Sequence, residues 1–171
     1  MEYANVMQKP VIEKVVVNIC VGESGEKLMK AEKLLEKITG MKPVRTVSTH
    51  KIPAWGLRKG EAIGCKVTLR GAKADEVLKN LLFAKDDKVS ESSFDAHGNM
   101  SFGIREYIDI KGMKYDPEIG IFGLDVCVTI KRPGFRVTRR KKKKSRIPKS
   151  SYITREEAIS LMKEKFGVEI E

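Results

Sequence analysis

The stretch from Lys59 to Gly71, K-G-E-A-I-G-C-K-V-T-L-R-G, alternates strictly between apolar and hydrophilic residues from Ile63 to Arg70. Because successive side chains of a β-strand point to opposite faces of a sheet, the alternation predicts a strand with one apolar and one hydrophilic face. The apolar face consists of Ile63, Cys65, Val67 and Leu69, and the other face of Gly64, Lys66, Thr68 and Arg70. Gly64 leaves room for another backbone to approach closely. Two cations and a hydroxyl suit nucleic acid, although an antiparallel sheet can simply face water on one side.

The excess positive charge of the chain lies in one segment. The net charge is +11, from 34 basic and 23 acidic residues. Residues 131–149 contain 11 basic residues and no acidic one, which leaves 23 basic residues elsewhere to balance the 23 acidic ones. Because charges at this density repel one another, we expect residues 131–149 to resist packing and to be ordered only by a polyanion.

Composition predicts one domain, residues 1–171, in a chain that is 41% hydrophobic and long enough to bury a core. The chain has no apolar run of bilayer-spanning length, and its first ten residues lack the layout of a signal peptide, so we expect a cytoplasmic protein with no membrane partner. Cys20, Cys65 and Cys127 are far apart and form no C-x-x-C pair. We therefore expect core or near-core thiols and neither zinc, a disulfide framework nor another cofactor.

Hydrophobic periodicity predicts four further strands, at residues 11–20, 44–48, 100–110 and 124–131. In the strand at 100–110, Tyr107 is expected on the outer side, and the interruption at Glu106 is typical of a bulge or a sheet edge. Three helices are predicted: one follows an N-cap at Ser24 and ends before Gly40, one spans residues 75–84, and one opens on the capping box of Thr154 and Glu157. This order predicts an α+β fold, mainly an antiparallel sheet with helices packed on one face, an open face, and a long basic loop before the C-terminal helix.

The connection T-H-K-I-P-A-W-G-L-R-K-G-E, from Thr49 to Glu61, lies between two predicted strands. It combines four basic or potentially basic side chains with the only tryptophan of the chain: His50, Lys51, Trp55, Arg58 and Lys59. A basic loop with an aromatic residue and glycines, between two strands, is typical of a finger that contacts nucleic acid. The alternative is a hairpin tip with Trp55 packed against the body of the protein.

The sequence lacks the constellations that enzymes need, and we expect no catalytic activity. Its two histidines, His50 and His97, lie in predicted loops without a cysteine or carboxylate pattern, and the adjacent Asp86 and Asp87 fit a solvated turn. Three basic surfaces favour structural RNA binding instead. They are the Thr49–Glu61 loop, residues 131–149, and a hydrophilic sheet face with Lys14, Asn18, Lys66, Thr68, Arg70 and Arg105.

Four motifs resemble the large-subunit ribosomal protein five family, in order and at the family's spacing. They are K-V-V-V-N-I-C-V-G-E from Lys14, T-G-M-K-P-V-R-T from Thr39, R-K-G-E-A-I-G-C-K-V-T-L-R-G from Arg58, and S-F-G-I-R-E from Ser101. R-P-G-F-R-V from Arg132 and the basic insertion that follows resemble the archaeal and eukaryotic branch. Met41 departs from the glutamine common in bacterial members, which removes one expected polar contact.

The resemblance implies a protein of the central protuberance that binds 5S rRNA and helps attach it to the large-subunit rRNA. It also implies contacts of the Thr49–Glu61 loop with peptidyl-site tRNA, a bridge to small-subunit ribosomal protein thirteen, and a monomer within the ribosome. Asn18 and Thr68 fall where family members hydrogen-bond 5S rRNA. With the basic surfaces, the implied rRNA-binding set is Lys14, Asn18, Arg45, Lys66, Thr68, Arg70, Arg136, Arg139, Arg140, Lys141, Lys142 and Lys143. The implied tRNA-binding set is His50, Lys51, Trp55, Arg58 and Lys59.

A different class stays open at the level of sequence. A basic scaffold or chaperone outside the mature ribosome would carry the same charges in residues 131–149 and touch RNA only incidentally. Such a protein would not need Asn18 and Thr68 on one sheet face.

Overall fold

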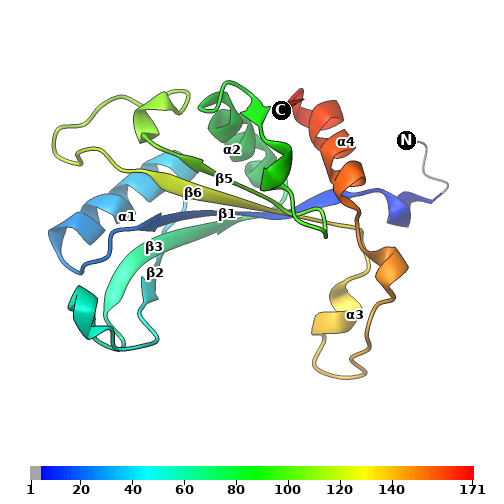
Figure 1. Ribbon diagram of the computed structural model, residues 1–171, viewed down its shortest axis with the longest axis horizontal. Helices are drawn as coiled ribbons and strands as arrows, with labels where there is room; N and C mark the ends of the chain where they lie inside the picture. Colours follow the sequence, from blue (N-terminus) through cyan, green and yellow to red (C-terminus); the bar gives the residue numbers. More distant parts are fainter. Residues whose placement is uncertain (1–4) are drawn as a thin grey trace.

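A five-stranded sheet in the order β2-β3-β1-β6-β5 organises the computed structural model, which describes residues 5–171 (Figure 1). All four pairings in the sheet are antiparallel. The strands are β1 (Val11–Cys20), β2 (Val44–Val47), β3 (Ala62–Leu69), β5 (Met100–Ile104) and β6 (Leu124–Lys131). The predicted α+β class with a mainly antiparallel sheet is confirmed.

β1 is the central strand, and its alternation decides which face of the sheet is buried. Val15, Val17 and Ile19 are at most 1% exposed, whereas Val16 and Asn18 between them are partly exposed. Val17 pairs with Val67 of β3 on one side and with Val126 of β6 on the other. β-branched side chains pack well on a pleated surface, which explains why this valine-rich run forms the middle of the core.

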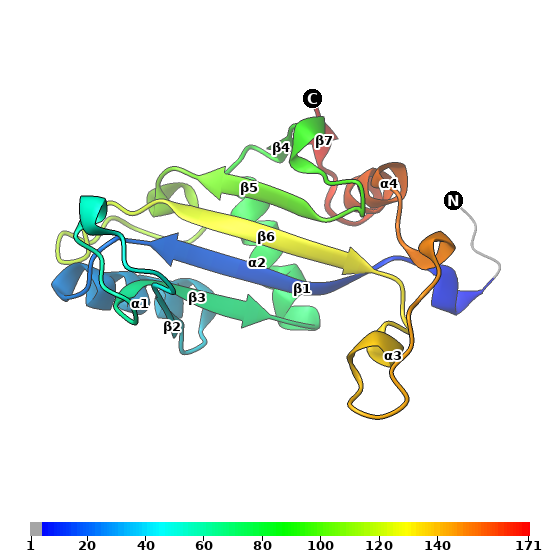
Figure 2. The same ribbon diagram turned by 60° about the horizontal axis from the view of Figure 1, so that its bottom comes forward.

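Helices cover one face of the sheet and leave the other open (Figures 1 and 2). α1 (Glu26–Thr39) and α2 (Ala72–Phe83) lie along that covered face, and α4 (Arg155–Phe166) lies near the end of the sheet opposite to α1. Each helix buries an apolar stripe at helical spacing, consisting of Leu28, Ala31, Leu34 and Leu35 in α1, Ala74, Val77, Leu78, Leu81 and Leu82 in α2, and Ala158 and Met162 in α4. The stripes meet the apolar faces of the strands in one continuous core.

Helix ends follow the predicted capping signals with one exception. Thr154 and Glu157 form the capping box of α4, and Gly40 ends α1 in the left-handed conformation. Ser24 is not the N-cap of α1: Gly25 occupies that position with φ 122°, and the Ser24 hydroxyl donates instead to Glu61 Oε1 at 3.0 Å. The predicted cap is therefore wrong because Ser24 is used to tie the helix entrance to the loop before β3.

The predicted strand over residues 100–110 is too long. β5 ends at Ile104, and residues 107–109 form the 3₁₀ turn η4 (Tyr107–Asp109). Tyr107, expected on the outer side, is fully buried, and its hydroxyl accepts from the Asp116 N–H at 3.0 Å. A buried tyrosine that anchors the following loop cannot continue the period of a strand. The position of β5 at an edge of the sheet agrees with the interruption at Glu106.

Short elements complete the structure. β4 (Lys88–Val89) and β7 (Glu169–Ile170) form a small parallel pair that ties the C-terminal end to the loop after α2. Residues 131–149 contain one helical turn, α3 (Arg136–Arg139), and the remaining turns are η1 (Val6–Gln8), η2 (Pro53–Trp55), η3 (Glu91–Ser93) and η5 (Lys149–Ser151). Two-residue strands carry too little periodicity to be seen in the sequence.

The three cysteines are free thiols, and only one lies in the core. Burial raises the pKa of the Cys65 thiol to about 11. Cys20 and Cys127 are exposed, so the prediction of core or near-core positions is wrong for these two residues. Both follow the alternation of their strands onto the uncovered side.

Gly64 is required by the neighbouring strands. A Cβ added there would lie 2.8 Å from the Ile19 carbonyl oxygen and 2.9 Å from Thr46 Oγ1. The close approach predicted from the sequence is therefore made by β1 and β2 within the sheet, and this glycine serves the packing of the sheet.

Replacing Gly64 with Ala should lower the free energy of unfolding by about 1–3 kcal/mol, because one backbone oxygen and one hydroxyl must move. Gly103→Ala on β5 is the matched control, since a Cβ there meets only Asp125 Oδ1 at an ordinary 3.6 Å. Urea unfolding of both variants checks this expectation. Equal stability of the two would show that the sheet adapts at Gly64 without a loss of stability.

Candidate nucleic-acid interface

The open face of the sheet lies between two projections. The loop with η2 extends from one end of the sheet, and the segment with α3 extends from the other end, both on the side away from α1 and α2 (Figure 1). Figure 2 shows the strands of the open face directly, with α1 and α2 behind them. Two of the three predicted basic surfaces thus flank the third.

Strand register places the predicted sheet residues in neighbouring rows of the open face. Asn18 lies between Lys66 of β3 and Asp125 of β6, and Val16 lies between Thr68 and Cys127. Lys14 pairs with Thr129 in the next row. A shallow hollow of about 690 Å³ covers part of this face and is lined by Asn18 and Lys66 with residues of β5 and β6, among them Ser101, Asp125 and Cys127.

Four polar side chains of this face are unpaired in the part of the chain that the structure describes. Within the described residues, the side chains of Lys14, Asn18, Lys66 and Thr68 make no hydrogen bond or ion pair. Asn18 and Thr68 carry both donors and acceptors, and the two lysines add positive charge. Asp125 is a carboxylate in the same rows that sequence reasoning did not include, although its alternation with Val126 marks it as outward-facing.

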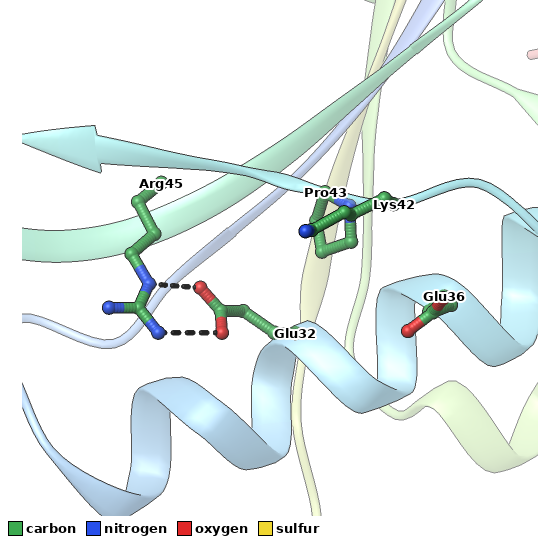
Figure 3. Close-up of a pocket in the computed structure, with 5 residues that line it drawn as sticks. All are labelled: Glu32, Glu36, Lys42, Pro43 and Arg45. Atoms are coloured by element: carbon green, nitrogen blue, oxygen red, sulfur yellow. Dashed lines mark hydrogen bonds and ion pairs between the residues drawn. The ribbon is translucent and has the colours of Figure 1, made fainter.

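Arg45 does not share this face. It pairs in register with Cys65, which points into the core, and its guanidinium donates to Glu32 of α1 from Nε at 2.5 Å and from Nη2 at 3.0 Å (Figure 3). The Arg45 guanidinium lowers the pKa of Glu32. Strand alternation therefore turns the Arg45 side chain to the helix side of the sheet, away from the open face, and its role in rRNA binding stays a prediction.

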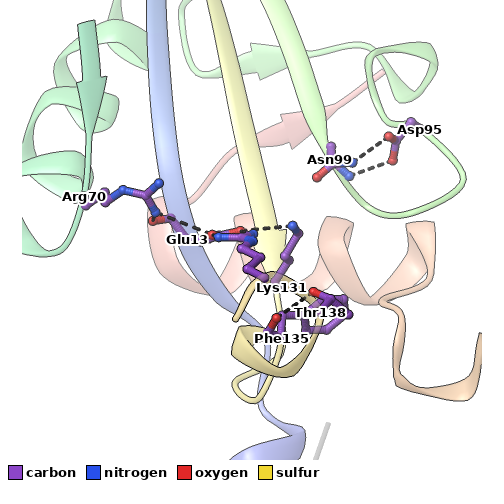
Figure 4. A network of polar contacts seen from close by, with 8 residues as sticks. Glu13, Arg70, Asp95, Asn99, Lys131, Phe135 and Thr138 are labelled. Atoms are coloured by element: carbon purple, nitrogen blue, oxygen red, sulfur yellow. Dashed lines mark hydrogen bonds and ion pairs between the residues drawn. The ribbon is translucent and has the colours of Figure 1, made fainter. Parts of the chain in front are cut away.

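Glu13 gathers three cations at one end of the open face. A register shift between Ile12 and Lys14 leaves Glu13 as the extra residue of a β-bulge in β1. Its carboxylate lies 3.2 Å from Lys131 Nζ, 3.5 Å from Arg70 Nη1 and 2.9 Å from Arg139 Nη2, and Arg139 Nη1 donates to the other oxygen (Figure 4). Hydrogen bonds from Arg139 and then Lys131 hold the pKa of Glu13 at about 2, although partial burial raises it. We call Glu13, Arg70, Lys131 and Arg139 the Glu13 cluster.

Sequence reasoning missed the Glu13 cluster. It assigned Arg70 and Arg139 to rRNA binding and gave neither a partner within the protein, whereas both donate to one carboxylate. The residues come from the ends of β1, β3 and β6 and from α3, and strict alternation would have turned Glu13 into the core. The bulge that reverses its direction leaves no signal in a single sequence.

Residues 131–149 are attached to the body at their base and exposed at their tip. Arg132 donates to Glu157 Oε1 at 2.6 Å and to the Ser150 carbonyl at 3.0 Å, and both side chains of this ion pair are less than a fifth exposed. Phe135 packs edge-on against Tyr152 at 5.4 Å between ring centroids. The expectation that this segment resists packing is therefore wrong for its base, because Glu13 and Glu157 neutralise part of its charge. Arg136, Arg139, Arg140, Lys141, Lys142 and Lys143 remain exposed.

The Thr49–Glu61 loop is a short hairpin with an exposed aromatic ring. Ile52 and Leu57 bridge its two sides, and Leu57 is buried. Trp55 is 73% exposed, so the alternative in which it packs on the body is wrong. Glu61 closes the base by accepting from the Arg58 N–H at 3.0 Å, and His50, Lys51, Arg58 and Lys59 are exposed around it.

The remaining sequence features carry no ligand chemistry. Asp86 and Asp87 both have φ near +55° and form the turn that ends α2, as predicted. Among residues 5–171, no helix combines the length and the apolar character that crossing a bilayer requires. In the same part of the chain, no group of three or more His, Cys, Asp or Glu side chains could hold a metal ion.

The Glu13 cluster should make the stability of the protein depend on pH in the acidic range. Because the folded pKa of about 2 lies below the ordinary value of 4.5, the cluster stabilises the protein above about pH 4.5, and this contribution disappears as the pH falls toward 2. Between pH 7 and pH 3, wild type should lose about 2 kcal/mol more unfolding free energy than Glu13→Gln. Urea unfolding at both pH values measures this difference. Glu76→Gln, an exposed substitution on α2, is the control and should lose as much unfolding free energy as wild type. An equal loss in Glu13→Gln would contradict the assignment of this pH dependence to Glu13.

Comparisons with known proteins agree with the motifs. The family model "Ribosomal protein L5" matches residues 5–58, and the model of the C-terminal part of the same ribosomal family matches residues 62–164. The chain is 52% identical to "Large ribosomal subunit protein uL5" of Methanosphaera stadtmanae, over 98% of this chain and 99% of the relative. It is 53% identical to the protein of that name from Sulfurisphaera tokodaii, over 97% and 94%, and 49% identical to that from Methanococcoides burtonii, over 98% and 99%.

These relatives are named as ribosomal proteins and not as enzymes, and all three come from archaea. The predicted family and its archaeal type are confirmed. With two family models that together match most of residues 5–164, and with relatives about half identical over nearly the full length, the chain belongs to the L5 family of large-subunit ribosomal proteins.

Proposed function

We propose that this large-subunit ribosomal protein binds 5S rRNA through the open face of its sheet and helps attach it to the large-subunit rRNA in the central protuberance. It acts in the cytoplasm as a monomer within the ribosome. One observation carries the proposal: the donors and acceptors of Lys14, Asn18, Lys66 and Thr68 lie together on the open face and have no partner within the described residues.

The chemistry of these groups suits RNA. A-form RNA displays 2′-hydroxyls and phosphates along a shallow minor groove, where neutral amide and hydroxyl side chains can donate and accept. Lysines beside them displace counterions from the phosphates. Contacts to sugar and phosphate position the protein, so this face recognises the shape of the RNA.

Contacts with peptidyl-site tRNA and with small-subunit ribosomal protein thirteen form a second part of the proposal. The hairpin around Trp55 supports the tRNA contact because its ring is exposed among cations and its base is held by Glu61. Aromatic rings of this kind stack on bases, and the surrounding cations follow the RNA backbone. The bridge to the small subunit rests on the family resemblance alone.

We further propose that residues 1–171 fold as one domain. β1 belongs to the segment matched by the first family model, and it lies between β3 and β6, which belong to the segment matched by the second. Neither segment retains a complete sheet without the other.

Replacing Asn18 and Thr68 together with Ala should weaken binding to 5S rRNA by about tenfold per lost hydrogen bond, because each leaves an RNA partner unpaired. Thermal stability should stay nearly unchanged, since neither side chain bonds within the described residues. Filter binding with 5S rRNA and an unrelated stem-loop measures the effect, with Asn80→Ala on α2 as the control from the covered face. Wild-type affinity of the double variant would exclude the open face as the 5S rRNA platform.

Replacing Trp55 with Ala should leave 5S rRNA binding intact and weaken retention of tRNA in the peptidyl site, because stacking on one ring is worth about 1–3 kcal/mol. Substitution is a sharper test than deleting the loop, since Leu57 is buried and a deletion would also disturb packing. Ribosomes rebuilt with the wild-type protein or with Trp55→Ala can be assayed for the rate of tRNA dissociation from the peptidyl site. A loss of 5S rRNA binding would overturn the division of roles between loop and sheet.

A further inference from the structure

The Glu13 cluster borders a hollow at the base of residues 131–149. The hollow has a volume of about 280 Å³, and its lining includes Glu13, Lys131, Phe135, Arg136 and Arg139. It lies where β1 begins, β6 ends and α3 follows, so its walls come from segments more than 120 residues apart in the sequence.

Cations outnumber carboxylates around this hollow. Arg139 uses Nη1 and Nη2 to donate to Glu13 and keeps its Nε–H, and Lys131 donates one of its three N–H groups. Arg136 also lines the hollow and has no hydrogen-bond or ion-pair partner for its side chain within the described residues. One carboxylate therefore holds Lys131 and Arg139 in place and leaves an excess of positive charge around the hollow.

We propose that this hollow binds a phosphate group of RNA, and that Glu13 is a positioning residue which assembles the site before RNA arrives. The proposal rests on the proposed function for the source of the phosphate. Arginine forks match phosphate oxygens in planar, bidentate geometry, and the exposed cations of residues 140–144 continue the positive surface beside the hollow. The apolar sides of Phe135 and Val11 leave room for a ribose next to the phosphate.

An internal carboxylate helps binding by ordering the cations in advance. Without Glu13, Lys131 and Arg139 would repel each other and sample many rotamers, and RNA would have to order them with a loss of affinity. Glu13 can do this because the bulge fixes it in the central strand and only 17% of its side chain is exposed. In the opposite case Glu13 would compete with phosphate for the same donors. The two cases predict opposite effects of removing its charge.

Glu13→Gln and Glu76→Gln provide the test, because each raises the net charge by one and only the first touches the cluster. We expect Glu13→Gln to bind 5S rRNA about tenfold more weakly than Glu76→Gln, although both carry the same charge. Binding to an unrelated stem-loop should also be weaker for Glu13→Gln, because that RNA carries phosphates as well. If Glu13→Gln binds 5S rRNA as tightly as Glu76→Gln, or more tightly, Glu13 is no positioning residue.

A second pair of variants tests the site even if Glu13→Gln fails to fold. Arg139→Gln removes one cation of the cluster and keeps Glu13, and Arg140→Gln makes the same charge change one residue further along the exposed run. Arg139→Gln should lose more 5S rRNA affinity than Arg140→Gln and should have the flatter salt dependence. Equal losses would mean that the basic run acts only through its total charge.

A readout without 5S rRNA separates this site from the proposed function. Inorganic phosphate titrated into wild-type protein should shift the NMR signal of Arg139 Nε–H and saturate, and the shift should be lost in Glu13→Gln. This result would stand even if the open face failed to prefer 5S rRNA. No saturable shift in wild type, or a stronger response to a polyglutamate peptide than to an RNA oligonucleotide, would overturn the phosphate assignment and point to an acidic protein partner.

Discussion

The pairing of β1 with β3 on one side and β6 on the other is the constraint on which the structure depends. Every second residue of β1 is locked into the core by this double pairing, which forces the residues between them onto the open face. Asn18 therefore has a fixed position between Lys66 and Asp125, and Val16 between Thr68 and Cys127. A slip of one residue would bury the polar row and expose the valines, so the same packing that stabilises the fold aligns the polar side chains of the open face.

The bulge at Glu13 is the one departure from this pattern in β1, and it links the sheet to the basic segment. An extra residue in the central strand turns a carboxylate toward the cations of β3, β6 and α3. Arg132 and Glu157 make a second attachment, mostly shielded from water, between the same segment and α4. Two carboxylates thus determine where the base of residues 131–149 lies, while its tip, from Arg140 to Lys144, is exposed.

Regular periodicity was enough to predict β1, β3, β6 and the three main helices, because each buries a stripe that recurs at its own period. It failed where a single contact overrides the period. The Tyr107 side chain is buried and its hydroxyl accepts from the Asp116 N–H. The Ser24 hydroxyl donates to Glu61 and does not cap the helix. A bulge keeps Glu13 out of the core, where strict alternation would place it. Arg45 shows a further limit: the alternation of β2 puts it on the helix side, but four residues are too few to reveal this beforehand.

Net charge suggested RNA as a partner class, but it did not show which cations are available to bind RNA. Several cations of the predicted set, Arg45, Arg70 and Arg139, are held by carboxylates in the folded protein, whereas Lys14 and Lys66 have no partner among the described residues. A cation that already pairs with a carboxylate offers RNA fewer donors, but it meets the phosphate in a fixed position. An unpaired lysine offers its full charge, but RNA must then order a flexible chain. The open face combines the two kinds: neutral groups and free lysines in its middle rows, and pre-positioned arginines at the end where the basic segment begins.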